Sequence, residues 1–118
     1  MSAYIELKNQ IEQAISERIT EAERLTDDQA EIATILGDAG QIAVYIEPPE
    51  ITYQTWHIRQ ATFTVHLIHP VRDDEHEALN ELLELVERLE HIEPWGLEEA
   101  RPAMFAGEIP EYIIKITA

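Results

Sequence analysis

The segment between Asp74 and Pro94 constrains the fold most, because its apolar residues recur with the spacing of an α-helix. Asp73 or Asp74 is expected to cap this helix, and Pro94 to end the helical region. Burial of five large side chains from one helix face contributes roughly 8–15 kcal/mol before entropy is subtracted, so the chain must provide a second apolar layer. The expected apolar face consists of Ala78, Leu79, Leu82, Leu85, Val86 and Leu89, with Leu83 at its edge.

The same helix carries much of the negative charge of the chain. Residues 73–99 contain eleven of the 24 acidic residues and one base, Arg88. Glu84 and Arg88 are four residues apart, which predicts a helical ion pair. This distribution favours a scaffold that presents an acidic surface over an enzyme built around a reacting centre. The expected acidic surface, opposite the apolar face, consists of Glu77, Glu81, Glu84 and Glu87.

Alternating apolar residues predict strands in the middle and at the end of the chain. Pro48 and Pro49 end the first of them. The longest β-like stretch loses its hydrophobic character at Arg59 and Gln60, and is either two strands that bend near there or one long strand that projects beyond the sheet. Phe63, Val65 and Leu67 share one face of it. The expected strands lie at residues 42–46, 51–69, 103–106 and 111–117.

The N-terminal part of the chain is expected to be helical. An apolar stripe predicts a helix over residues 2–24, and a capping pattern at Thr26 predicts a short helix over residues 27–36. Arg18 falls inside the stripe. Its aliphatic stem either covers the core while the guanidinium reaches water, or the guanidinium forms a salt bridge to an acidic partner across an interface.

Together these elements predict one α+β domain over residues 1–118. Helices packed on one face of an antiparallel sheet are the economical arrangement for this order of elements. We expect a mainly antiparallel sheet of about four to five strands, with two main helices packed on one face. The hydrophobic content of 45% is sufficient for one core.

The composition excludes several classes of function. The chain has no cysteine, so disulfides, thiolate metal sites and cysteine nucleophiles are excluded. A formal charge of −16 repels phosphate backbones, so no specific nucleic-acid binding is expected. No signal peptide is expected, and no apolar run approaches the ~20 residues that span a bilayer, so no membrane partner is expected either. A basic protein partner, or exclusion of DNA from a surface, fits this charge better.

Groups that would carry chemistry are few. His66 and His69 are expected to point to opposite faces of a strand, which prevents them from sharing one ion. His76 lies among acidic residues, where the alternatives are a loose divalent-ion site and a solvated helix start. Both serines lie on the first predicted helix, and no glycine-rich phosphate loop is present. We therefore expect no catalytic residue, no metal and no cofactor, and we do not expect an enzyme.

The remaining indication of function comes from aromatic residues, methionine and proline. One group lies at the end of the 42–46 strand and the start of the next, and a second group surrounds the loop after Pro94. These residue types either close the open end of a small core or form an interface, where aromatic residues and Met are enriched. A strand that projects beyond its sheet would suit packing between subunits. The candidate interface residues are Arg18, Pro48, Pro49, Tyr53, Trp56, Trp95, Met104 and Phe105.

These patterns resemble the small tail-terminator (tail-completion) proteins of long-tailed bacteriophages and prophages. The resemblance rests on the N-terminal helix, the acidic leucine-rich helix and four short sequences. It spans most of the chain in element order, and the segment 26–36 is a departure from it. The four sequences are IEPP at residues 46–49, VHLIHP at 65–70, RPAMFA at 101–106 and YIIKIT at 112–117.

The resemblance implies a structural role in the virion tail, with assembly in the cytoplasm of the bacterial host. Such proteins form a ring, usually hexameric, that caps the tail tube and contacts the head–tail connector proteins. DNA passes through the ring, and an acidic lumen would keep it from adhering. The partners implied are therefore other copies of the chain, the tail tube protein and the connector.

Three other interpretations remain, and one of them is a small metal-dependent enzyme that would bind a metal ion near His76 or His66. Another head–tail connector or neck protein would share this class of structure. A monomeric acidic protein-binding module, resembling a DNA mimic, would use the same charge to occupy a basic nucleic-acid-binding protein.

Overall fold

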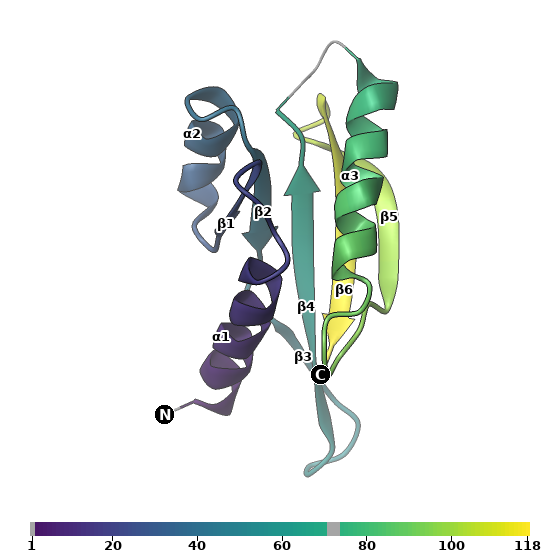
Figure 1. Cartoon of the computed structure of the whole chain (residues 1–118). Helices are drawn as coiled ribbons and strands as arrows, with labels where there is room; N and C mark the ends of the chain where they lie inside the picture. Colours follow the sequence, from purple (N-terminus) through teal and green to yellow (C-terminus); the bar gives the residue numbers. More distant parts are fainter. Residues whose placement is uncertain (1, 71–73) are drawn as a thin grey trace.

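The computed structural model describes residues 2–70 and 74–118, and these form a six-stranded sheet flanked by helices (Figure 1). The strand order is β1–β2–β4–β6–β5, with β3 paired to β4 outside this path. The pairs are antiparallel except for β1 and β2. The predicted α+β class is confirmed, with slightly more strands than expected. The elements are α1 (Ala3–Ser16), β1 (Glu23–Thr26), a 3-10 turn (Gln29–Glu31), α2 (Ile32–Gly37), β2 (Ile42–Ile46), β3 (Glu50–Tyr53), β4 (Arg59–Ile68), α3 (Glu75–Leu89), β5 (Glu99–Phe105) and β6 (Ile109–Thr117).

The main core lies between the sheet and the two long helices, α1 and α3, which cover one face that we call the main face (Figure 1). Phe63, Val65 and Leu67 of β4 are fully buried there, as their alternation predicts. The predicted apolar side of α3 faces them. Its buried residues are Ala78, Leu82, Leu85, Val86 and Leu89.

A smaller core lies on the opposite face of the sheet, which we call the second face. Ile32 and Ile35 of α2 pack there against Ala43 of β2 and Ile68 of β4. Ala43 and Ile68 are each next to a strand residue that is buried in the main core. One end of β2 and one end of β4 are therefore buried on both faces of the sheet.

The prediction of a helix over residues 2–24 is wrong beyond Ser16. The chain turns after α1, and residues Glu23–Thr26 form β1, which pairs in parallel with β2. In the turn, the Thr20 backbone N–H donates to Glu23 Oε1 (2.9 Å). Pairing with β2 satisfies backbone groups that a longer helix would have satisfied internally, so a tertiary contact overrides the local helical period.

The stretch 51–69 forms two strands, one of the two predicted alternatives. The break lies at residues 54–58, before Arg59, and Arg59 itself is paired with Tyr53. The pairing of β4 with β6 begins only at Thr62. The hairpin of β3 and the start of β4 therefore projects from the sheet at the lower end of Figure 1.

Two details of α3 differ from or refine the expectation. The Glu77 backbone N–H donates to the carboxylate of Asp74 (3.0 Å), so Asp74 caps the helix, while the alternative cap, Asp73, lies outside the described residues. Arg88 pairs with Glu23 of β1 at 2.7 Å rather than with Glu84.

The closing strands β5 and β6 are longer than the predicted ranges 103–106 and 111–117.

Candidate interaction surfaces

The tip of the β3–β4 hairpin presents large apolar side chains to solvent. Trp56 is 92% exposed, Tyr53 65% and Ile58 48%. Backbone hydrogen bonds hold the turn, and in one of them the Gln54 N–H donates to the Ile58 carbonyl (2.9 Å). The Trp56 and His57 rings pack edge to face, with their centroids 4.5 Å apart. The tip is therefore an ordered apolar surface that the chain itself does not cover.

The hairpin is tied to α1 at the residue pair next to its turn, Tyr53 and Arg59. The guanidinium of Arg59 lies 5.2 Å from the centre of the Tyr4 ring, which is within the range of a cation–π contact. Pro48 is exposed and Pro49 half-buried in the connection between β2 and β3. The first predicted aromatic and proline group is thus distributed along one hairpin, with the prolines at its start and Tyr53 and Trp56 at its far end.

The second predicted group, Trp95, Met104 and Phe105, does not form a cluster. Trp95 is half-buried against the main core, whereas Phe105 packs against the smaller core of the second face. Met104 and Phe105 are neighbours on β5 and so point to opposite faces of the sheet. The sequence places these residues close along the chain, and the folding of β5 separates them.

The side chain of Arg18 makes hydrogen bonds within its own chain. Its guanidinium donates to the carbonyl oxygens of Ala14 (2.9 Å) and His91 (3.4 Å), near the C-terminal ends of α1 and α3. A cation at the C-terminal end of a helix is stabilised by the helix dipole. Arg18 therefore ties the two long helices together through backbone carbonyl groups.

The four glutamates of the expected acidic surface are all exposed on α3. Glu81 also bonds the buried His69, which follows β4. The exposed side of α3 is therefore mostly negative, although Glu81 is turned toward His69 and Arg88 adds one base. The residues that form it are Glu77, Glu81, Glu84 and Glu87.

A cluster that the sequence did not reveal lies on the second face. His66 Nδ1 lies 2.6 Å from Oε1 of the buried Glu111, and His66 Nε2 bonds the carboxylate of Glu47. Burial lowers the pKa of His66, but the two carboxylates outweigh it and the pKa is raised above 6.5. Sheet pairing brings together three residues that are distant in sequence, and no local motif indicates this cluster.

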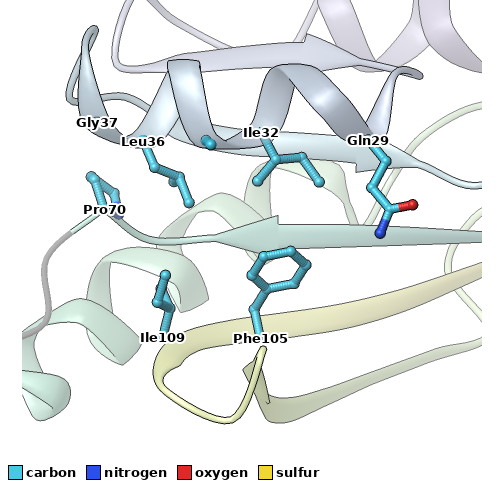
Figure 2. A pocket seen from close by; sticks show the side chains of 8 residues that line it. Gln29, Ile32, Leu36, Gly37, Pro70, Phe105 and Ile109 are labelled. Carbon is cyan, nitrogen blue, oxygen red and sulfur yellow. The ribbon is translucent and has the colours of Figure 1, made fainter.

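An apolar pocket of about 390 Å³ lies at the other end of the molecule from the hairpin tip. Figure 2 shows Ile32 and Leu36 of α2 facing Phe105 and Ile109 of the β5–β6 hairpin across this pocket. Gln29 lies at one end of it (Figure 2). No sequence pattern indicated this pocket, because its walls come from three segments that are more than 30 residues apart along the chain.

Within residues 2–70 and 74–118, no group of three or more histidine and acidic side chains is placed to hold a metal ion. The predicted alternative of a divalent-ion site near His76 partly involves Asp73, which lies outside the described residues. In the same described part of the chain, none of the helices has the length and apolarity needed to span a bilayer.

Comparison with protein-family models finds no family that matches the chain, and comparison with curated proteins finds no match.

Proposed function

We propose that this protein is a ring-forming structural subunit of a bacteriophage or prophage tail, a tail terminator that caps the tail tube and contributes to the head–tail junction. The proposal rests on the element order described above and on one observation above all. The β3–β4 hairpin projects beyond the sheet and carries Tyr53, Trp56 and Ile58 on an ordered but uncovered tip. Exposed aromatic clusters of this kind mark surfaces that a partner covers.

The charge of the chain supports the same proposal. A ring that conducts DNA needs an inner surface that repels phosphate, and α3 carries four exposed glutamates that would provide it. The ordered hairpin turn reduces the entropy lost when a neighbour binds, which favours assembly from preformed subunits.

The assembly test compares the mass of the wild-type protein with that of Trp56→Ala across a concentration series, by light scattering and negative-stain imaging. We expect closed rings for the wild type, formed by the protein alone or on purified tail tubes, and loss of those rings in Trp56→Ala. Leu83→Ala is the matched control, since Leu83 is also an exposed large apolar residue but lies on α3. A wild-type protein that stays monomeric both alone and with tail tubes would refute the proposal.

The acidic side of α3 favours a second candidate, a monomeric acidic module that binds a basic protein. In that case, replacing Glu77, Glu81, Glu84 and Glu87 by glutamine would abolish binding to the basic partner, and Trp56→Ala would leave it intact. The two candidates therefore respond to different substitutions. A third candidate, another neck protein, predicts rings that bind the connector but do not stop tube growth.

A further inference from the structure

We propose that the hairpin tip of one subunit docks through Trp56 into the apolar pocket between α2 and the β5–β6 hairpin of a second copy of this chain. This inference rests on the self-assembly proposed above and names its acceptor site. Trp56 is the most exposed large apolar side chain among the described residues, and this pocket is lined by Ile32, Leu36, Phe105 and Ile109.

The two surfaces cannot meet within one chain. The hairpin tip precedes β4 and the pocket lies beyond its end, where Pro70 forms part of the wall. The ten residues of β4 span roughly 33 Å at the rise of an extended strand. The contact is therefore between copies and joins two different surfaces, and such head-to-tail contacts close into rings when the rotation between neighbours allows it.

The pocket has the size and the lining that an indole side chain requires. Its volume of about 390 Å³ falls within the range of roughly 300–1,000 Å³ in which proteins enclose small organic molecules. Aliphatic and aromatic side chains face one another across it (Figure 2). A buried indole N–H also needs a hydrogen-bond acceptor, and the side-chain amide of Gln29 lies at the end of the pocket to supply one.

The charges of the two surfaces are complementary. In a chain of net charge −16, residues 51–70 contain no acidic residue, and Arg59 next to the tip carries a positive charge. The residues next to the pocket lining include the exposed acids Asp28 and Asp38. Two acidic surfaces of this protein would repel each other, whereas the tip and the acidic pocket rim do not, and this favours the proposed orientation of the contact.

The absence of native cysteine allows a direct test by site-specific cross-linking. Thr55→Cys places a thiol beside Trp56, and Ala33→Cys places one at an exposed position of the pocket wall. When the two single variants are mixed under assembling conditions and oxidised, we expect a disulfide-linked pair that contains one copy of each. Leu83→Cys on α3 is the control, and it should not link to Thr55→Cys.

A second measurement uses a variant that blocks the acceptor. Ala33→Glu introduces a charge into the pocket at a solvent-accessible helix position, so the fold is retained, as thermal unfolding would verify. We expect Ala33→Glu and Trp56→Ala each to weaken self-association by about 30-fold or more, the effect of losing one interface hot spot. Glu introduced instead at Leu83 should have no such effect.

The outcomes separate this inference from the proposed function. Two results would overturn the docking and leave ring assembly unaffected. One is that Ala33→Glu forms rings normally. The other is that Thr55→Cys cross-links to Leu83→Cys as readily as to Ala33→Cys. A protein that remains monomeric both alone and with tail tubes overturns both.

Discussion

Replacing Arg88 by methionine removes the partner of a buried carboxylate and should destabilise the protein strongly. The side chain of Glu23 is 3% exposed. It accepts hydrogen bonds from Arg88 Nη1 (2.7 Å) and from the Thr20 backbone N–H (2.9 Å). Arg88 Nη1 also donates to the carbonyl oxygen of Arg18 (3.1 Å). In Arg88→Met, Glu23 keeps only its bonds from Thr20, and a buried charge loses its counter-ion.

The expected magnitude follows from the exposure of the two partners. Breaking a fully buried pair by removing one partner costs about 3–5 kcal/mol. The side chain of Arg88 is 37% exposed and Thr20 remains, so we expect a loss of about 2–3 kcal/mol in the free energy of unfolding. For a chain of this length, that corresponds to a decrease in Tm of roughly 10 °C.

The pH dependence gives a second, independent signature. Burial raises the pKa of Glu23, but hydrogen bonds from Arg88 and Thr20 outweigh it, and the pKa is lowered from its usual value of 4.5. Because the folded pKa is lowered, the ionised Glu23 contributes stability above pH 4.5 that is lost as the pH falls through the folded pKa. The difference between wild type and Arg88→Met should therefore be largest near neutral pH and shrink below pH 4.5.

Urea unfolding of both proteins at several pH values, followed by circular dichroism, measures these effects. Arg101→Met on β5 is the control, because Arg101 is also an exposed base but forms no ion pair with any residue that the structure describes. Adding Glu23→Gln to Arg88→Met should recover part of the loss, since the unpaired buried charge is then absent. The reasoning is refuted if Arg88→Met costs no more than Arg101→Met, or if its cost is the same at acidic and neutral pH.

Three further predictions concern the core and the two charged clusters. The raised pKa of His66 means that its bonds to Glu47 and Glu111 contribute stability that is fully present below pH 6.5 and is lost as the pH rises through the folded pKa. Urea midpoints should therefore fall between pH 6 and pH 9 more steeply in the wild type than in His66→Gln, and parallel curves would contradict this. Phe63→Ala removes a fully buried ring and should lower the free energy of unfolding by about 3–5 kcal/mol in urea titrations, whereas a cost below ~1 kcal/mol would mean that Phe63 is not central to the core. Changing the four α3 glutamates to glutamine reduces the formal charge from −16 to −12, so duplex DNA should bind more tightly in low-salt fluorescence anisotropy; equal binding of both proteins would exclude α3 as the DNA-repelling surface. These residues are Glu77, Glu81, Glu84 and Glu87.

Local sequence patterns were sufficient to predict the helices and strands that turn one side toward a single core. The helical spacing of leucines in α3 and the alternation of Phe63, Val65 and Leu67 in β4 predicted which side chains are buried. The proline pair after β2 likewise indicated where that strand ends, whereas the stretch 51–69 left two alternatives open, two strands or one long projecting strand. In these segments, the burial of apolar side chains and the geometry of the backbone favour the same structure, so the sequence alone predicts it.

Contacts between distant segments decided the rest. The apolar stripe suggested one helix to residue 24, but β1 forms because β2 offers backbone hydrogen bonds and Arg88 offers Glu23 a counter-ion 65 residues away. His66 gains its two carboxylates only through sheet pairing, and the apolar pocket exists only because α2 reaches the β5–β6 hairpin. Periodicity describes how a segment divides its own surface between core and solvent. It does not specify which distant charge or strand edge meets that segment, and in this protein the tertiary structure makes that choice.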